Sequence, residues 1–289
     1  MRLWKYIFVL LLLVLALEVI AVYQLPDSKF HIVACDVGEG DATLLIYRNI
    51  QILVDGGPNS KVLTCLGRHL PFWDRRIELV ILTHPDRDHF LGLIDVFKNY
   101  KIDSYLYNPI TVSKPEYKVL EREVGRGGVA RYNPINGQRL RLGLIYLDTL
   151  SPLAQLPFIN RQFSNEKEVP DNETNQYSIV SLVSFGKFRA ILTGDMTPSV
   201  SDGLAAARPD ISVNYIKVPH HGSKNGLTQN LLEILRPQIA TISVGKNLYG
   251  HPAPEIVEML NEKGVKTLRT DEEGDIEVVS DGEKFWTKN

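Results

Sequence analysis

The feature that most constrains this chain is an apolar strand that runs directly into four potential metal ligands. Residues 79–82 are aliphatic, and the ligands that follow are His84, Asp86, Asp88 and His89. Alternate side chains at an extended strand end point the same way, so the first three should converge, and the fourth should join them at the turn into a helix. Imidazole and carboxylate groups suit zinc and manganese. The alternative is a polar loop in which Asp88 caps the helix, but such a loop does not require two histidines and two aspartates.

Three further motifs place potential ligands after predicted strands. Asp195 follows the apolar residues 188–192, where a carboxylate can bridge two cations, although aspartate after glycine is also common in ordinary turns. His220 and His221 follow a strand predicted at 213–218. Neighbouring strand residues point to opposite sides, so His221 is the expected ligand, and His220 is expected in the substrate pocket, behind the ligand or in the core. Five of the seven histidines lie in these motifs or at 251, whereas a solvated surface would scatter them.

The segments around the last two histidine motifs supply candidates for catalysis and substrate contact. A loop at 245–252 is bounded by glycine and proline, so its histidine and asparagine could hold a phosphoryl oxygen or donate a proton; a helix-capping region is the alternative. Lys217, Lys224 and Lys246 suit an anionic-substrate patch or ordinary solvated lysines equally well. The expected catalytic residues are Asp88, His220 and His251, and the expected substrate-binding residues are Ser223, Lys224, Lys246 and Asn247.

Composition narrows the function classes. The 289 residues suit one large domain or two small ones, with 44% apolar residues for a core. A net charge of -2 gives no strong electrostatic footprint for nucleic acid, which disfavours tight nonspecific DNA binding but allows a local basic patch. The two cysteines, Cys35 and Cys65, are expected to be packed thiols rather than a disulfide, because the chain is large and poor in cysteine.

The N-terminus reads as a targeting segment. Arg2 and Lys5 precede an apolar run at 6–22 that only Glu18 interrupts. We expect residues 1–24 to be a signal anchor or signal peptide with a weak cleavage site after Ala21; a buried N-terminal helix is the alternative. Residues 25–29 then form a linker, and residues 30–289 form one catalytic domain outside the cytoplasm, anchored in the cell membrane or secreted.

The order of predicted elements indicates an α/β fold. A β-meander at 30–54 leads into strand–helix units, and the second half of the chain repeats that layout. The turns at 36–41 and 55–57 read as structural, with Asp41 placed behind the metal site. Residues 155–174 read as an active-site loop or a mobile insertion. Two packed mixed sheets with helices on both outer faces, preceded by an N-terminal hydrophobic helix, satisfy this order.

Taken together, the motifs resemble the metallo-β-lactamase fold, in particular the hydrolase-like domain of the competence protein ComEC. The resemblance covers residues 30–286. It implies an αββα sandwich. The carrying segments are Asp36-Val-Gly-Glu-Gly-Asp41, Asp55-Gly-Gly, Thr83-His-Pro-Asp-Arg-Asp-His89, Leu192-Thr-Gly-Asp195, His220-His-Gly-Ser223, Tyr249-Gly-His-Pro252 and Arg269-Thr-Asp-Glu-Glu-Gly-Asp275.

The resemblance implies two divalent metal ions, zinc or manganese. One subsite comprises Asp88, His89, Asp195 and His221. The other comprises His84, Asp86 and the shared Asp195. This second set is poor in nitrogen, because Asp86 stands where the superfamily commonly has histidine and no histidine lies between 89 and 195; Asn175 falls in that region. We expect weaker binding there and a preference for a harder ion such as Mn²⁺.

The expected function is that of a metal-dependent phosphodiesterase or nuclease that acts on DNA through a dimetal-activated hydroxide. DNA is the expected substrate, the N-terminal segment is expected to contact the membrane, and a separate membrane channel protein is the expected partner. Two alternatives stay open. One is a small-molecule phosphoesterase of the same fold, and the other is a noncatalytic module that binds DNA or a partner.

Overall fold

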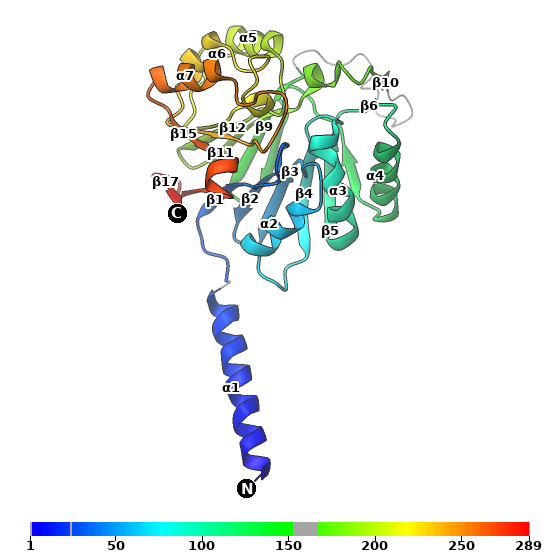
Figure 1. Ribbon diagram of the computed structural model, residues 1–289, viewed down its shortest axis with the longest axis vertical. Coiled ribbons are helices and arrows are strands. Elements are labelled where there is room, and N and C mark those ends of the chain that lie inside the picture. The colour runs from blue at the N-terminus through cyan, green and yellow to red at the C-terminus, as the bar shows by residue number, and fades with distance from the viewer. Residues whose placement is uncertain (1, 24, 153–166, 289) are drawn as a thin grey trace.

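The protein is a four-layer sandwich in which two β-sheets face each other between helices (Figure 1). The computed structural model describes residues 2–23, 25–152 and 167–288. This arrangement confirms the two mixed sheets with helices on both outer faces that the element order predicts. Of the expected loop at 155–174, residues up to 166 lie outside the described part of the chain, and the rest includes a short strand and a 3₁₀ turn.

The first sheet has eight strands in the order β17-β16-β1-β2-β3-β4-β5-β7. Its C-terminal hairpin returns to pair with the first strand, since β16 is antiparallel to β1. The first and last strands of the sandwich are therefore held in one sheet. The strands are β1 (Phe30–Ala34), β2 (Thr43–Tyr47), β3 (Ile50–Val54), β4 (Arg76–Leu82), β5 (Lys101–Tyr107), β7 (Ala130–Tyr132), β16 (Ile276–Ser280) and β17 (Phe285–Lys288).

The second sheet has seven strands in the order β15-β14-β13-β12-β11-β9-β8. Strands β12 to β15 run parallel, so their carboxyl ends meet at one edge. A small parallel pair, β6 (Ile110–Thr111) with β10 (Lys167–Glu168), lies apart from both sheets. The seven strands are β8 (Arg139–Leu142), β9 (Ile145–Ser151), β11 (Val180–Phe185), β12 (Phe188–Leu192), β13 (Tyr215–Lys217), β14 (Ile239–Ile242) and β15 (Lys266–Arg269).

Three helices cover each sheet. Buried residues of α2 (Lys61–His69), α3 (Arg87–Asn99) and α4 (Pro115–Arg126) pack on the first sheet, and those of α5 (Pro198–Ala207), α6 (Gln229–Leu235) and α7 (Pro254–Glu262) pack on the second. Short turns of helix occur at η1 (Thr174–Tyr177), η2 (Pro219–Gly222) and α8 (Thr270–Glu273).

Period-two alternation explains why the strands are apolar on both faces. In β1, Phe30 and Ile32 point into the core between the sheets, whereas Val33 points toward the helices on the first sheet. A sheet covered on both sides buries both sets of side chains, so its strands read as continuous apolar runs. That is the pattern of residues 79–82, which lead into the ligand motif.

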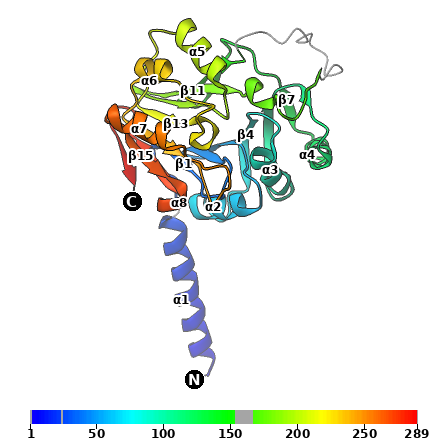
Figure 2. The same cartoon turned by 45° about the horizontal axis from the view of Figure 1, so that its top comes forward.

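Helix α1 (Arg2–Tyr23) extends away from the sandwich (Figures 1 and 2). Its large apolar side chains between Trp4 and Leu17 are exposed. Across residues 2–23, 25–152 and 167–288, no helix combines the length and apolar character needed to cross a membrane.

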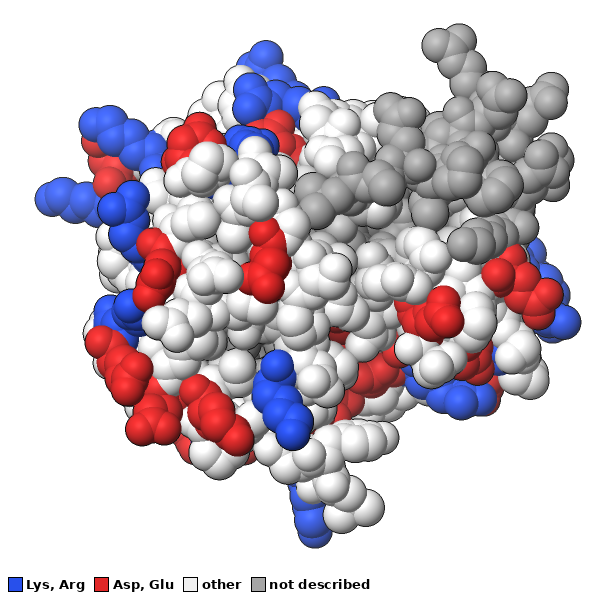
Figure 3. All heavy atoms as spheres, turned by 90° about the horizontal axis from the view of Figure 1, so that it is seen from above, with Lys and Arg blue, Asp and Glu red and all other residues white. Residues whose placement is uncertain are grey.

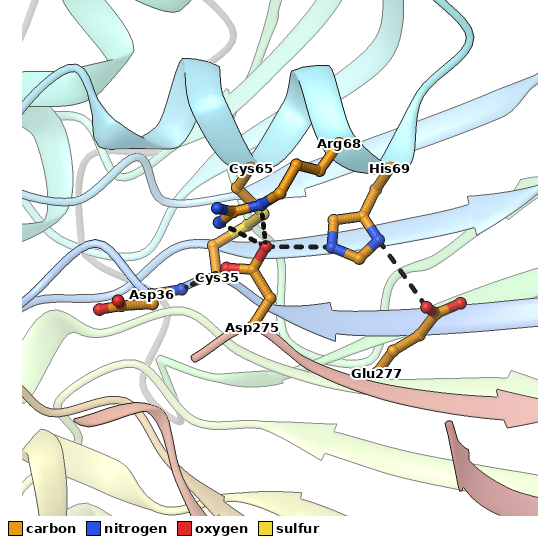
Figure 4. Close-up of a disulfide and its surroundings, with 7 residues drawn as sticks. All are labelled: Cys35, Asp36, Cys65, Arg68, His69, Asp275 and Glu277. Atoms are coloured by element: carbon orange, nitrogen blue, oxygen red, sulfur yellow. Dashed lines mark hydrogen bonds and ion pairs between the residues drawn. A yellow bond between two sulfur atoms is a disulfide. The ribbon is translucent and has the colours of Figure 1, made fainter. Parts of the chain in front are cut away.

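The two cysteines form a disulfide, so the expectation of two packed thiols is wrong (Figure 4). Cys35 directly follows β1 and Cys65 lies in α2, with their Cα atoms 5.8 Å apart. Both residues are fully buried in the core between the first sheet and its helices. The packing of α2 against the end of β1 brings them together, and the sequence alone does not reveal that contact.

Removing this disulfide is expected to lower the free energy of unfolding by about 3 kcal/mol, because the bond restricts the unfolded chain. The bonded residues are 30 positions apart. Urea denaturation of the oxidised protein should therefore have a clearly higher midpoint than the same titration of a Cys35→Ala/Cys65→Ala variant. Equal midpoints would contradict a contribution of the bond to stability.

A second expected effect depends on pH and concerns His31, which joins the linker at 25–29 to the C-terminal hairpin. Its Nδ1 lies 2.6 Å from Glu277 Oε1 and its Nε2 lies 2.9 Å from Asp27 Oδ1. Burial alone would lower the pKa of His31, but hydrogen bonds to these two carboxylates outweigh burial and raise the pKa above its ordinary value of 6.5.

A raised pKa in the folded state stabilises the protein below the unfolded pKa, and this contribution disappears as the pH rises through the folded pKa. His31→Gln should therefore lower Tm most near pH 6, and the difference from the wild type should shrink toward pH 9. Thermal unfolding followed by circular dichroism across that range checks the prediction. A difference that stays constant with pH would contradict it.

Candidate metal centre

The potential ligands gather where strands of both sheets end. His84 follows β4, Asp195 follows β12 and His221 follows β13, while Asp88 and His89 lie in the first turn of α3. Ligand sites of α/β sheets commonly lie at the carboxyl ends of their strands, because the connecting loops meet there. The loops that follow β1 and β3 add Asp41 and Asp55 to the same edge.

The centre of the cluster is made of buried imidazole and carboxylate groups. Asp195 lies between the two histidines, with its Oδ1 3.3 Å from His89 Nε2 and its Oδ2 3.5 Å from His221 Nε2. Asp88 Oδ2 is 3.1 Å from the same His221 nitrogen. The Asp88 side chain is 35% exposed, whereas the other three are buried. Of these four side chains, Asp88 is therefore the one that solvent reaches most.

One buried carboxylate orients two of the histidines. Asp55 Oδ2 accepts a hydrogen bond from His89 Nδ1 at 2.9 Å and another from the Thr83 hydroxyl at 2.8 Å. Because that hydroxyl donates to Asp55, it accepts from His84 Nδ1 at 3.0 Å. Both histidines are therefore protonated at Nδ1, which leaves their Nε2 atoms to face the cluster. Such outer partners fix the tautomer of histidine ligands.

A different acceptor orients His221. Its Nδ1 donates to the Ser243 carbonyl oxygen at 2.9 Å, which again leaves Nε2 directed at the carboxylates. The backbone of His220, His221 and Gly222 is left-handed, with φ values of 53°, 52° and 77°. This conformation is costly for residues other than glycine and occurs preferentially at functional sites. It turns the chain sharply after β13 and directs His221 inward.

The charges of the cluster favour a cation. Burial alone would lower the pKa values of His89 and His221, but Asp195 and neighbouring carboxylates outweigh it and raise both well above the usual range. Burial would likewise raise the pKa of Asp195, yet His221 and His89 hold it well below its usual range. Against burial, His89 and His221 also lower the pKa of Asp88 to about 2.

These residues fit a divalent metal ion. His89 Nε2, His84 Nε2 and Asp195 Oδ1 are buried without a hydrogen-bond partner in the described structure. Leaving such atoms unsatisfied costs free energy. His89 Nε2 and Asp195 Oδ1, at the centre of the cluster, are best explained by a group that both bind, whereas His84 Nε2 has Asp86 Oδ2 3.6 Å away. Imidazole nitrogen and carboxylate oxygen atoms are suitable ligands for zinc or manganese.

Asp41 lies behind this cluster, as the turn at 36–41 predicts. One ligand atom from each of Asp41, His89, Asp195 and His221 lies within 4.8 Å of the others. The Asp41 carboxylate, however, is 3.9 Å from Nδ1 of His89 and 3.6 Å from Nδ1 of His221, on the side away from their Nε2 atoms. It also pairs with the Lys217 ammonium group. We therefore assign Asp41 to charge balance rather than to the ligand set.

The remaining predicted ligands lie beside the cluster. His84 Nε2 is 3.6 Å from Asp86 Oδ2, so these two side chains do approach each other. The other Asp86 oxygen accepts hydrogen bonds from Lys114 and Thr174. Lys114 belongs to no motif in the sequence analysis, whereas Thr174 is the last residue of the loop expected at 155–174.

His220 and His251 lie at the open side of the cluster. His220 Nε2 is 3.9 Å from Asp195 Oδ2, and burial lowers the pKa of this imidazole, which favours its neutral form. His251 Nδ1 donates a hydrogen bond to Glu39 Oε1 at 3.0 Å. Its ring lies 5.7 Å from that of His220 and 6.2 Å from that of His221.

The expected substrate-binding residues differ in how firmly the chain holds them. Lys224 is exposed. The Asn247 side chain, in contrast, donates to two carbonyl groups and accepts from three backbone amides of its own loop. Lys246 lines a shallow pocket with Glu39, and Ser223 Oγ accepts from the Asn225 amide. The asparagine therefore shapes the loop.

Lys217 does not contribute to a surface patch, which corrects one of the two interpretations of the lysines. Its side chain is buried, and its ammonium group contacts Asp41 and the Gly194 carbonyl oxygen. Burial would lower its pKa, but Asp41 and Asp195 raise it, so Lys217 stays charged. Asp55 also does more than the sequence predicts, since the turn at 55–57 is expected to be structural only.

A second group of potential ligands, next to the disulfide, does not resemble a metal site. Cys65, His69 and Asp275 offer ligand atoms within 4.8 Å of one another. The Cys65 sulfur atom is bonded to Cys35, and Asp275 is held by Arg68 and His69 (Figure 4).

The face seen from above has no continuous basic surface over its described residues (Figure 3). Lysine and arginine side chains alternate with aspartate and glutamate across it. This mixture agrees with the net charge of -2. Binding of a polyanion there would depend on local contacts rather than on a broad field.

Comparison with curated proteins identifies homologues named for competence and recombination, and no family model matches the chain. The chain is 26% identical to ComE operon protein 3 of Bacillus subtilis, covering 89% of this chain and 34% of that protein. It is 27% identical to Recombination protein 2 of Haemophilus influenzae and 24% identical to competence protein ComA of Neisseria gonorrhoeae, each match covering 86% of this chain. The chain spans about a third of the length of these relatives.

Solved structures show that the fold is that of the metallo-β-lactamases. The metallo-β-lactamase fold protein YhfI from Bacillus subtilis superposes with a TM-score of 0.58 at 11% identity, covering 87% of this chain and 100% of YhfI. The diiron β-hydroxylase CmlA from Streptomyces venezuelae gives 0.53 at 15% identity, covering 91% of this chain and 55% of CmlA. Zn²⁺-bound PqqB from Methylobacterium extorquens gives 0.52 at 11% identity, covering 83% and 97%.

Proposed function

We propose that this chain is a metal-dependent phosphodiesterase that cleaves DNA outside the cytoplasm. The observation that carries the proposal is the buried cluster in which Asp195 lies between two histidines whose Nε2 atoms face it. The names of the homologues, which refer to competence and recombination, support DNA as the substrate.

Four side chains would hold a divalent ion: Asp88, His89, Asp195 and His221. Such an ion would acidify a bound water molecule and neutralise charge on a phosphate oxygen. The protein supplies the rigidity that this chemistry needs. Asp55 holds the imidazole of His89 through Nδ1, and the Ser243 carbonyl oxygen holds that of His221 in the same way. The left-handed turn at 220–222 restricts the backbone where β13 ends. Asp88, which is partly exposed, borders the opening through which a substrate would enter.

His251 is the best-placed group to deliver a proton to the leaving oxygen. With Nδ1 hydrogen-bonded to Glu39, its Nε2 is left for the substrate. Its ring is next to the His221 and His220 rings at the open side, so a phosphate bound at the cluster would lie beside it. General acid catalysis by one such group typically contributes about 10²–10⁴-fold.

His251→Gln should therefore lower the cleavage rate of single-stranded DNA by about 10²-fold. The same variant should hydrolyse bis(p-nitrophenyl) phosphate at a rate close to that of the wild type, because a phenolate leaves readily without a proton, whereas the alkoxide of DNA does not. Steady-state kinetics on both substrates check this split. Equal losses on the two substrates would assign His251 a structural or binding role instead.

Two features support a location outside the cytoplasm. Disulfides persist in oxidising compartments and are rare in the cytosol, and this chain has one in its core. The exposed apolar side chains of α1 favour contact with lipid rather than with water. We propose that α1 serves as an export signal or membrane attachment and that a separate channel protein takes the cleaved strand onward.

A small phosphoester is the second candidate substrate, because the face in Figure 3 mixes both charges. A salt titration separates the two candidates. Cleavage of a polyanion that contacts several cationic groups weakens steeply as salt rises, whereas a small ester shows little dependence.

The direct test uses the purified domain with Mn²⁺ or Zn²⁺ and compares it with Asp88→Ala on single-stranded DNA. The wild type should cleave and the variant should not. DNA cleavage that is unchanged in the variant, or absent from the metal-loaded wild type, would remove the proposal.

A further inference from the structure

The carboxylate of Asp86 already has a cationic partner within the chain. Lys114 Nζ lies 2.6 Å from Asp86 Oδ1 and 3.0 Å from the Pro85 carbonyl oxygen. The Thr174 hydroxyl donates to the same Asp86 oxygen at 2.8 Å. The Lys114 side chain is 8% exposed, so this is a buried ion pair.

The fold places this lysine at a defined position. Lys114 immediately precedes α4, whose first turn begins with Pro115, and Val112 just before it is buried. Tyr117 of the same helix packs against Phe90 of α3, the helix that carries Asp88 and His89. Buried contacts on either side of Lys114 therefore fix the start of α4 and hold the ammonium group beside the ligand motif at 84–89.

A second metal ion beside His84 would have few ligands and a repelling neighbour. The donors there are His84 Nε2 and Asp86 Oδ2, 3.6 Å apart, together with Asp195, which also serves the main cluster. Catalytic zinc sites normally have three protein ligands of their own. An ammonium group bonded to Asp86 also repels a divalent cation, and in a site of low dielectric this repulsion is strong.

The pairing of charges also disfavours a second divalent ion beside His84. Lys217 pairs with Asp41 behind the cluster, and Lys114 pairs with Asp86 beside it. Within the described part of the chain, no lysine hydrogen-bonds to Asp88 or Asp195, although Lys217 Nζ forms a longer ion pair with Asp195 Oδ1 at 3.7 Å. Their two negative charges match one divalent ion.

We infer that Lys114 replaces one of the two metal ions, so that the centre holds a single divalent cation at Asp88, His89, Asp195 and His221. This inference rests on the proposed metal site and replaces the two ions expected from the sequence. Lys114 thereby provides a fixed positive charge at Asp86 Oδ1, beside the place between His84 Nε2 and Asp86 Oδ2 where the other ion would lie.

Metal content after loading with Mn²⁺ and desalting tests the inference without reference to activity. The wild type should retain one ion per chain, and so should Asp86→Asn, since Asp86 is not needed as a ligand. Lys114→Met, which removes the charge but keeps an aliphatic side chain of similar length, should retain two, and a single retained ion in this variant would count against the inference. Lys114→Arg is the matched control and should retain one.

Electron paramagnetic resonance adds a second measurement. Wild-type protein should give the hyperfine pattern of an isolated Mn²⁺ ion, and Lys114→Met should add the pattern of a coupled pair. Two ions in the wild type, or an Asp86→Asn variant that loses its ion, would overturn the inference while leaving the proposed function intact. No retained ion in the wild type would overturn both.

Discussion

Replacing Asp195 by alanine is expected to abolish tight metal binding and to lower phosphodiesterase turnover by on the order of 10³-fold. Asp195 contacts both His89 Nε2 and His221 Nε2, so its loss removes the central carboxylate of the site. A metal ion contributes several kcal/mol of transition-state stabilisation, and about 4 kcal/mol corresponds to this factor. Metal content and hydrolysis of bis(p-nitrophenyl) phosphate measure the two effects on one preparation.

Asp210→Ala is the control for this prediction. Its side chain is 84% exposed and pairs weakly with Arg208 at 4.0 Å, far in the fold from the strand ends that form the cluster. This variant should retain both metal and activity. If Asp195→Ala remained folded and still bound its ion as tightly as the wild type, the assignment of the ligand set would be wrong.

Gly92→Ala is expected to destabilise the protein by more than about 3 kcal/mol, as severe overpacking does. Gly92 lies in α3 directly against the loop that carries Asp55, and its amide donates to the Gly57 carbonyl oxygen. A Cβ atom at Gly92 would lie 1.9 Å from the Gly56 carbonyl oxygen and 2.6 Å from that of Asn59. These neighbours are backbone atoms, so relief requires the loop to move away from α3.

Gly67→Ala is a matched control, because Gly67 also lies within a helix of the first sheet but has open space around the position of an added Cβ. It should leave stability unchanged or raise it by up to about 1 kcal/mol, since alanine is the better helix former. Urea denaturation of both variants checks the contrast. Similar midpoints for the two variants would show that the contact between α3 and the Asp55 loop is not tight.

The strand ends carry most of what could be predicted from the sequence. Residues 79–82 predict a strand buried on both faces, and the ligand motif follows it directly. The prediction that His89, Asp195 and His221 meet depends on the ligand motifs and on the family resemblance, because His89 follows a strand of one sheet and the other two residues follow strands of the second. The distances among these three side chains agree with that expectation.

What could not be predicted depends on contacts between residues that are far apart in the sequence. The disulfide requires α2 to pack across the end of β1, and Lys114 reaches Asp86 only because α4 begins beside α3. Asp55 was placed correctly in a turn, but its role in orienting two histidines depends on a hydrogen bond through Thr83. Such relations come from packing rather than from local pattern.

Anomalous diffraction from crystals soaked in Mn²⁺ or Zn²⁺ tests most directly whether a cation binds at this cluster. The expected result is a strong peak bounded by Asp88, His89, Asp195 and His221, and none beside Asp86 and Lys114. Metal-soaked crystals with no anomalous density among those four side chains would contradict the account.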